Sequence, residues 1–332
     1  MTGRAIDNGI ADQTILDALL GTYYQSDAPE AGASSHWRHY SPQSQAVQDL
    51  DGRLVGLVGV GFGQATWSGS GDRALDQLCI AAHLVQLGHR RRIFSFLGRL
   101  RTVCRAMGTD PTMDAFRQAC TLELLDRHVP HASRQRLRLV IIGDGQGALA
   151  ALAKSLWPRA RITLIDLGRT LLFQALHCQK AYPQSRHVLV TENAPHMVNA
   201  DFVYCAADQV TALEGETFDL AVNVASMQEM TATTVAEYFA FLRRRLSPAG
   251  LFYCCNRQRK VLPDGEVSSF AHYPWNVRDR VLVDGPCPWH QYFVSPSRTA
   301  PKLTIGGVPV PLFRRYDGPH VHRLAALAVG TN

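Results

Sequence analysis

The sequence lacks two features that would place it in a special class. No two of its eight cysteines have the C-x-x-C spacing, and no run of about 18 apolar residues occurs along the chain. The first absence argues against a zinc knuckle, and the second against a membrane-spanning helix. Several cysteines lie inside apolar runs, where a thiol packs as a small hydrophobic side chain. We therefore expect a reduced, cytoplasmic protein with no membrane contact.

The chain also has little excess charge of one sign. It carries 34 basic and 28 acidic residues, a formal charge of +6, and the two signs are interspersed. Nucleic-acid binding needs a concentrated basic patch, so we interpret the excess as an ordinary enzyme surface and expect no nucleic-acid partner. We interpret the most basic helical stretch, residues 89–101, as a solvated face or as a contact within a homodimer.

The first part of the chain has the period of helices. A short helix is expected at residues 10–20, followed by a polar stretch containing SSHWRHYSPQ, which we interpret as a lid or arm. Apolar residues then recur at helical spacing over residues 74–127. The glycine-bearing segment 56–64 is followed by a loop instead of a second strand that ends in an acid, so it indicates a tight turn and not a phosphate cradle. Residues 1–132 are thus predicted to form a mainly helical region that acts as a lid or in oligomerisation.

The rest of the chain has the pattern of an α/β domain. Short β-rich apolar runs alternate with helical or turn segments, which is typical of a parallel sheet covered by helices on both faces. These runs are RLRLVIIG, RITLID, FVYCAA, FDLAVNVA and LFYCCN. We therefore predict a Rossmann-like fold over residues 133–332, with the boundary near residues 130–137.

A glycine-rich turn in this domain predicts a nucleotide site. Gly143, Asp144, Gly145 and Gly147 lie directly between a predicted strand and a predicted helix. Glycine lets the chain turn sharply and lets a ligand approach the backbone, and the helix start offers free N–H groups. Asp166 ends the next strand, 19 residues after Gly147, where a carboxylate can accept both hydroxyl protons of a ribose.

The turn alone does not decide between a nicotinamide dinucleotide and S-adenosylmethionine. The turn lies in mid-chain after a helical region, and the strand FDLAVNVA leaves a polar loop at its carboxyl end; both features favour S-adenosylmethionine. Asp208, at the end of another strand, is a candidate acceptor for the adenine amino group, and Glu192 competes with it. Asn223, at the end of FDLAVNVA, is also expected at the cofactor.

At this point the sequence resembles the family of sugar O-methyltransferases that are similar to the nanchangmycin deoxysugar O-methyltransferase. The resemblance spans roughly residues 137–276, in the segments IGDGQGALAALA, ITLIDL, LLFQALHCQKAYPQ, NVASMQEM, CCNRQRK and HYPW. It implies S-adenosylmethionine as cofactor and a sugar hydroxyl, often of a deoxysugar in a natural product or polysaccharide, as methyl acceptor. Ile141 stands where many methyltransferases have an acid that supports the methionine amino group, and Asp144 is the candidate for that role.

The predicted catalytic residues are Glu229 and His272. Glu229 is the anionic group in the loop SMQEM and is able to accept a proton, although a carboxylate there also fits a helix-capping role. His272 has the right ordinary basicity, although beside Tyr273 it equally fits a packed wall. We expect contacts to the substrate from Gln228, Asn256, Arg257 and Trp275. No tight carboxylate cluster lies near SMQEM, so no metal is expected.

Other functions remain open from the sequence. The predicted partner is a small molecule, a glycoside or a sugar nucleotide, and the alternative is a methyltransferase whose acceptor is a carbon, a nitrogen or a non-sugar hydroxyl. A nicotinamide-dependent oxidoreductase is a rival because the turn also fits a dinucleotide pattern. A binding protein that kept the fold without catalysis is a second rival, since fold does not secure function.

Overall fold

We describe the fold from a computed structural model of the chain. The described residues are 10–24, 33–40, 45–48, 54–58, 70–87, 91–129, 134, 136–191, 199–294, 301–316 and 318–328. Three features of the sequence analysis lie wholly or mostly outside the described residues: the predicted boundary at 130–137, the segment 56–64 and Glu192. No described helix is both long and apolar enough to cross a membrane.

The N-terminal region is helical, as predicted. Its helices are α1 (Ile10–Leu19), continued by the π-helical turn η1 (Leu20–Tyr24), then α2 (Ser35–Tyr40), α3 (Ser70–Leu87), α4 (Arg91–Met107) and α5 (Met113–His128). A short antiparallel pair, β1 (Gln45–Gln48) and β2 (Leu54–Val58), lies between α2 and α3. Thr112 caps α5, where its hydroxyl accepts a hydrogen bond from the Ala115 N–H over 3.2 Å.

The second part alternates strands and helices. Its strands are β3 (Arg138–Ile142), β4 (Arg161–Asp166), β5 (His187–Leu189), β6 (Phe202–Ala206), β7 (Phe218–Val224), β8 (Leu246–Arg257), β9 (Arg259–Val261), β10 (Val267–Ser269), β11 (Arg280–Pro286), β12 (Tyr292–Val294), β13 (Lys302–Ile305), β14 (Val308–Arg315) and β15 (His320–Ala326). Its helices are α6 (Ala148–Leu156), α7 (Gly168–Ala181) and α8 (Ala232–Arg245), with 3₁₀ turns η4 (Ala207–Leu213), η5 (Met227–Glu229) and η6 (Phe270–His272).

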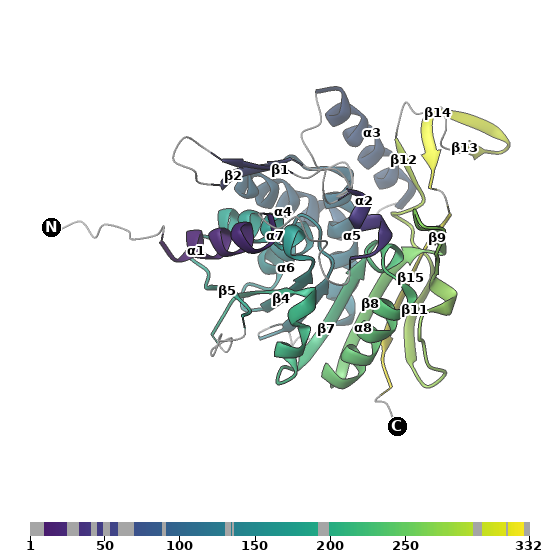
Figure 1. The fold of residues 1–332 in the computed structure, drawn as a ribbon. Helices are drawn as coiled ribbons and strands as arrows, with labels where there is room; N and C mark the ends of the chain where they lie inside the picture. The colour runs from purple at the N-terminus through teal and green to yellow at the C-terminus, as the bar shows by residue number, and fades with distance from the viewer. Residues whose placement is uncertain are drawn as a thin grey trace.

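One eight-stranded sheet organises the molecule (Figure 1). Its strand order is β11-β15-β8-β7-β3-β4-β6-β5; the strands from β8 to β5 run parallel, and β15 is antiparallel to both of its neighbours. The order reverses beside β3, and open α/β sheets bind their ligands at the carboxyl edge of such a reversal. The predicted Rossmann-like α/β fold is therefore confirmed, with a mixed sheet in place of an all-parallel one.

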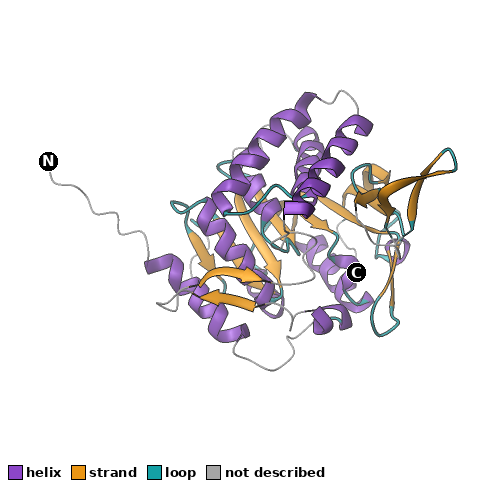
Figure 2. Cartoon of the chain, turned by 90° about the horizontal axis from the view of Figure 1, so that it is seen from above, coloured by secondary structure: helices purple, strands orange, loops and turns teal. Residues whose placement is uncertain are grey.

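The two faces of the sheet carry different layers (Figures 1 and 2). Side chains alternate along β3, so that Leu139 and Ile141 join one core cluster while Val140 and Ile142 join the other. The first cluster also takes in α1, α4, α5, α6 and α7, and the second is covered by α8. Helix α4 packs on α5, α6 and α7. The N-terminal helices thus extend the helical layer on one face, and they share its core.

Candidate functional site

The glycine turn between β3 and α6 has the backbone that only glycine adopts without strain. Gly143, Gly145 and Gly147 have φ angles of 74°, 63° and 81°. A Cβ on Gly143 would lie 1.8 Å from Ser226 Oγ, and one on Gly147 would lie 3.1 Å from Gln174 Cα. The first clash concerns the loop after β7, and the second concerns the packing of α7 on α6. Both glycines are therefore required by close contacts as well as by the turn.

Asp144 lies at the amino end of α6, where free N–H groups and the helix dipole favour an anion. Its carboxylate accepts hydrogen bonds from the N–H groups of Leu149 (3.0 Å) and Ala150 (2.7 Å). Burial nevertheless raises the pKa of Asp144 to about 7, against these two bonds and with a further contribution from the nearby charge of Asp166. Ile141, by contrast, is buried in the core, whereas Asp144 belongs to the turn itself and lines the cavity there.

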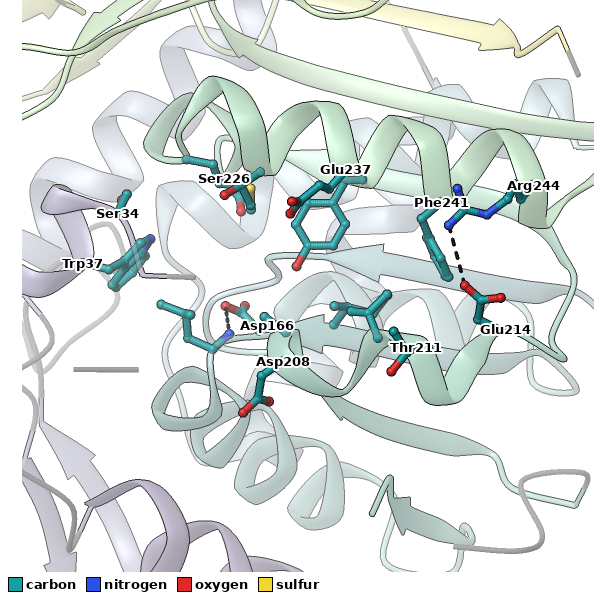
Figure 3. A pocket seen from close by; sticks show the side chains of 17 residues that line it. Ser34, Trp37, Asp166, Asp208, Thr211, Glu214, Ser226, Glu237, Phe241 and Arg244 are labelled. Atoms are coloured by element: carbon teal, nitrogen blue, oxygen red, sulfur yellow. Dashed lines mark hydrogen bonds and ion pairs between the residues drawn. The ribbon is translucent and has the colours of Figure 1, made fainter. Parts of the chain in front are cut away.

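A first cavity of about 380 Å³ opens at the carboxyl ends of β4 and β6 (Figure 3). Asp166 and Asp208 lie on one side of it, and Ser226 and Glu237 face them from the other. Trp37 of α2 closes one end. The apolar part of its wall comes from Ile165, Leu167, Val210, Met230, Tyr238 and Phe241. An acid-flanked, half-apolar cleft of this kind suits a nucleoside, whose base is flat and apolar and whose ribose presents hydroxyl donors.

Asp166, in the wall of this cavity, is held in place by two hydrogen bonds. One carboxylate oxygen accepts a hydrogen bond from the Leu167 N–H (2.8 Å), and the other accepts one from Gln174 Nε2 (2.6 Å). Each carboxylate oxygen can accept more than one hydrogen bond, so a hydrogen bond from the protein does not by itself exclude a ribose hydroxyl. Asp208 lies in η4 and is exposed. Glu192, the rival for the adenine amino group, lies outside the described residues.

A second cavity of about 750 Å³ adjoins the first. Trp37, Asp166 and Ser226 line both. The second cavity also takes in the glycine turn from Gly143 to Gln146. Ala225 lines it with φ of 58°, a left-handed conformation that is uncommon outside glycine, and it places Ser226 where the two cavities meet. The two spaces therefore form one binding region around the turn.

Glu229 lines the second cavity between two basic side chains. Its carboxylate lies 2.7 Å from Lys260 Nζ and 3.3 Å from His36 Nε2. Ser34, beside His36, donates a hydrogen bond to the Glu229 backbone carbonyl. Burial pushes the pKa of Glu229 upward, but the hydrogen bond from His36 and the charge of Lys260 bring it below its ordinary value. Burial in turn lowers the pKa of Lys260, in spite of its carboxylate partner.

The predicted substrate residues Gln228, Asn256 and Arg257, and Asn223, which was predicted at the cofactor, fall into two groups. Gln228 and Arg257 line the second cavity, and the Arg257 guanidinium lies 5.5 Å from the centre of the Tyr316 ring. Asn223 and Asn256 line neither cavity. Asn256 Nδ2 donates to Asn223 Oδ1 (2.8 Å), and Asn223 Nδ2 donates to the Ile142 carbonyl (2.8 Å). This buried pair joins the ends of three neighbouring strands and fixes the loop that carries Ser226 and Glu229.

Two further predicted residues lie away from both cavities. His272 is exposed in η6. Trp275 packs edge-to-face on Phe239, with ring centres 4.8 Å apart, and lies under the guanidinium of Arg323 at the same distance. The segment HYPW therefore covers α8 and β8 and does not reach the glycine turn.

Several residues at the site were not singled out by sequence reasoning. His36 and Trp37 come from SSHWRHY, and Lys260 comes from CCNRQRK. His290, Tyr316 and His320 follow the last predicted strand. A histidine and tryptophan in an otherwise polar arm are the one local signal available, because a polar linker seldom carries both. Nothing local indicates that this arm reaches Glu229.

Comparison with known proteins adds no family assignment. No family model and no curated protein matches the sequence. Coclaurine N-methyltransferase bound to N-methylheliamine and S-adenosylhomocysteine is 12% identical over 63% of this chain and 72% of its own, with a TM-score of 0.40. A TehB-like methyltransferase of Corynebacterium glutamicum is 14% identical over 71% and 98%, with a TM-score of 0.37. Magnesium protoporphyrin IX methyltransferase of Synechocystis with bound S-adenosylmethionine is 10% identical over 63% and 78%, with a TM-score of 0.36. Because each TM-score is below 0.5, the assignment of the site rests on this chain's own geometry.

Proposed function

We propose that the chain is an S-adenosylmethionine-dependent methyltransferase that methylates a hydroxyl group of a sugar. The observation that carries the proposal is the arrangement of two joined cavities about one glycine turn. The smaller cavity has the acids and apolar wall that suit a nucleoside, and the larger one holds Glu229 beside His36. Ser226, where the cavities meet, marks where the reacting atoms would come together.

The residues present fit this cofactor. In the cofactor's bound position Asp166 would accept hydrogen bonds from the ribose hydroxyls and Asp208 one from the adenine amino group. The turn at Gly143 and Gly145 leaves the backbone open to the amino-acid end, and the Asp144 carboxyl lies there to pair with its ammonium group. Asp144 would thus support the methionine amino group, which Ile141, having no carboxylate, does not.

The lining of the larger cavity favours a polyhydroxylated acceptor. Most of its side chains away from the turn carry hydrogen-bonding groups, and their charges are of both signs. They include Asp110, Asp114, Arg117, Gln118, Arg257 and Lys260. A sugar presents many hydroxyl donors and acceptors, and each needs a partner when it leaves water. An aromatic or terpenoid acceptor presents few such donors and acceptors to this lining.

Methyl transfer needs orientation and removal of one proton. When bound, the cofactor would supply an electrophilic methyl group, whose carbon would bond to the acceptor oxygen while the carbon–sulfur electron pair stayed on sulfur. His36 takes up the hydroxyl proton, and the Glu229 carboxylate, 3.3 Å away, stabilises the imidazolium that forms. The cavity walls orient the sugar for in-line attack, a contribution of up to about 7–11 kcal/mol in well-oriented reactions.

Glu229 alone is a weaker candidate for the base. Its pKa lies below the ordinary value because His36 and Lys260 stabilise the ionised form. A base works best when its pKa is near the working pH, and the hydrogen bond from His36 together with the charge of Lys260 moves the pKa of Glu229 away from it. We therefore assign the proton to His36 and the electrostatic role to Glu229.

The direct test is incubation with labelled S-adenosylmethionine and a panel of deoxysugar glycosides and sugar nucleotides, with the methyl group located by mass spectrometry. We expect label on a sugar oxygen, saturable binding of S-adenosylhomocysteine and no response to NAD or NADP. Binding of NAD in place of S-adenosylhomocysteine would support an oxidoreductase. Label on nitrogen, carbon or a non-sugar hydroxyl would keep the methyltransferase and overturn the sugar as acceptor.

A further inference from the structure

Two thiols and an imidazole meet in the core behind the larger cavity. His290 Nδ1 lies 3.4 Å from Cys287 Sγ and 3.7 Å from Cys255 Sγ. The three ligand atoms all lie within 4.8 Å of one another, and all three residues are buried. Cys255 belongs to β8, whereas Cys287 and His290 form a C-x-x-H turn between β11 and β12. The fold thus adds a distant cysteine to a local pair with metal-ligand spacing.

The distances match the edges of a tetrahedral site. Zinc binds thiolate sulfur at about 2.3 Å and imidazole nitrogen at about 2.0–2.1 Å, so tetrahedral ligands have sulfur–nitrogen separations of about 3.5–3.6 Å. The two separations here lie on either side of that value. Soft thiolates select zinc over magnesium and calcium, which prefer oxygen. We propose that Cys255, Cys287 and His290 bind a zinc ion, a site separate from the methyl-transfer chemistry.

His320 is the candidate for the fourth ligand: its nitrogens lie outside the 4.8 Å group formed by the other three, so its ring would move toward the ion on binding. Its ring stacks on that of His290, with centres 4.8 Å apart and planes at 25°. The side chain is buried, and Nδ1 has no hydrogen-bond partner within the part of the chain that the structure describes. A buried polar atom without a partner is costly, and coordination of a metal would satisfy it. With that movement, Cys255, Cys287, His290 and His320 would make a closed four-ligand site.

Such an ion would tie together segments that line the substrate cavity. His290 and His320 both line it, while β8 leads directly into Arg257. A zinc ion would pin the turn at Cys287 and the start of β15 to the end of β8. The site is therefore structural, and it supports one wall of the larger cavity.

The experiment measures zinc in full-length protein purified under reducing conditions, incubated with zinc chloride and dialysed. We expect one zinc per chain by elemental analysis in the wild type. Cys255→Ala and His290→Ala should lose it, and His320→Ala should bind zinc about tenfold more weakly or worse. The matched control is Cys254→Ala, because Cys254 is the next residue of β8, equally buried, and belongs to the core on the opposite face of the sheet. It should keep the full zinc content.

Three outcomes would overturn the proposal: absence of stoichiometric zinc in the wild type, equal zinc in Cys255→Ala and Cys254→Ala, or a Cys255–Cys287 disulfide in the reduced preparation. Cobalt titration offers a second readout, since thiolate ligation gives intense near-ultraviolet charge-transfer bands that Cys255→Ala should lack. Circular dichroism and S-adenosylhomocysteine binding show whether each variant is folded. The cofactor turn lies elsewhere in the molecule. The zinc measurement therefore tests the metal site separately from the proposed methyl transfer.

Discussion

The carboxylate of Glu229 lies 3.3 Å from the imidazole Nε2 of His36, and so joins the loop after β7 to helix α2 in the N-terminal arm. Trp37, the next residue of α2, lines both cavities. The arm therefore does more than cover the site. In the proposed mechanism it supplies the proton acceptor, and the site is complete only when α2 lies against the sheet edge.

We expect His36→Ala and Glu229→Gln to lower kcat by about 10²–10⁴, because the first removes the proton acceptor and the second removes the charge that stabilises its protonated form. Cofactor affinity should change little. Methyl transfer at saturating cofactor, with S-adenosylhomocysteine binding alongside, measures both. His39→Ala is the control for His36, since His39 lies on the same helix but is exposed. Normal turnover in His36→Ala would return the role of base to Glu229 or to another group.

Gly145→Val should abolish measurable cofactor binding in a folded protein. The φ of 63° at Gly145 is strained for any β-branched residue, and Gly145 lines the cavity at the turn that the cofactor's amino-acid end would approach. Calorimetric titration with S-adenosylhomocysteine measures the loss. Gly215→Ala is the control, because a Cβ there meets nothing within 4 Å. Unchanged affinity in Gly145→Val would remove the turn from the cofactor site.

Asp166→Ala should weaken S-adenosylhomocysteine binding by roughly 1–3 kcal/mol, because ribose hydroxyls would lose their acceptor. Gln174 now donates to Asp166, so part of any loss could come from a displaced Gln174. Gln174→Ala, which keeps the carboxylate, separates the two effects. Comparable losses in both variants would show that Asp166 acts through packing of α7 and not through the ribose.

Asp208 can be tested through the cofactor itself. S-inosylhomocysteine lacks the adenine amino group, so the wild type should bind it about tenfold more weakly than S-adenosylhomocysteine if Asp208 accepts from that group. Asp208→Ala should abolish the discrimination between the two compounds. Discrimination that persists in the variant would assign the amino group to another acceptor, such as Glu192.

Cofactor affinity should rise with pH through neutrality. Burial raises the pKa of Asp144 to about 7, whereas an ammonium group bound beside it would favour the ionised form, so binding should release a proton. Affinity for S-adenosylhomocysteine should increase about tenfold from pH 6 to pH 8 in the wild type. The slope should vanish in Asp144→Asn and persist in Asp208→Asn. Calorimetry in buffers of different ionisation enthalpy counts the proton directly, and no release would separate Asp144 from the ammonium group.

The raised pKa of Asp144 also makes the stability of the protein depend on pH. In the unfolded chain Asp144 would lose its proton near the ordinary value of 3.8, whereas in the native protein it keeps the proton until about pH 7. The native state then binds more protons across this window, so this residue makes the free energy of unfolding fall as pH rises from about 4 to about 7. Denaturant titrations at several pH values should show a smaller fall in Asp144→Asn.

Much of the site was predictable because it is contiguous in the chain. The strand, glycine turn, helix and second strand from Arg138 to Asp166 lie within 30 residues, and their glycines, apolar alternation and terminal acid each follow from local backbone requirements. The positions of His272 and Trp275 were harder to predict. The residue types that follow a strand do not determine the direction in which the chain continues. Here the segment HYPW turns back over α8, which its position in the sequence does not indicate.

The sequence by itself therefore determined the alternation of strands and helices, the glycine turn and the acid that follows it, because period and backbone conformation are local properties. Only the tertiary structure decided which distant segments meet there. It brought His36 to Glu229, and Cys255 to the turn of Cys287 and His290. It also joined Asn223 and Asn256 by a hydrogen bond between their side chains. These pairings depend on which face of the sheet each side chain takes and on how the helical layer closes over its edge, and both are set by burial of the whole core.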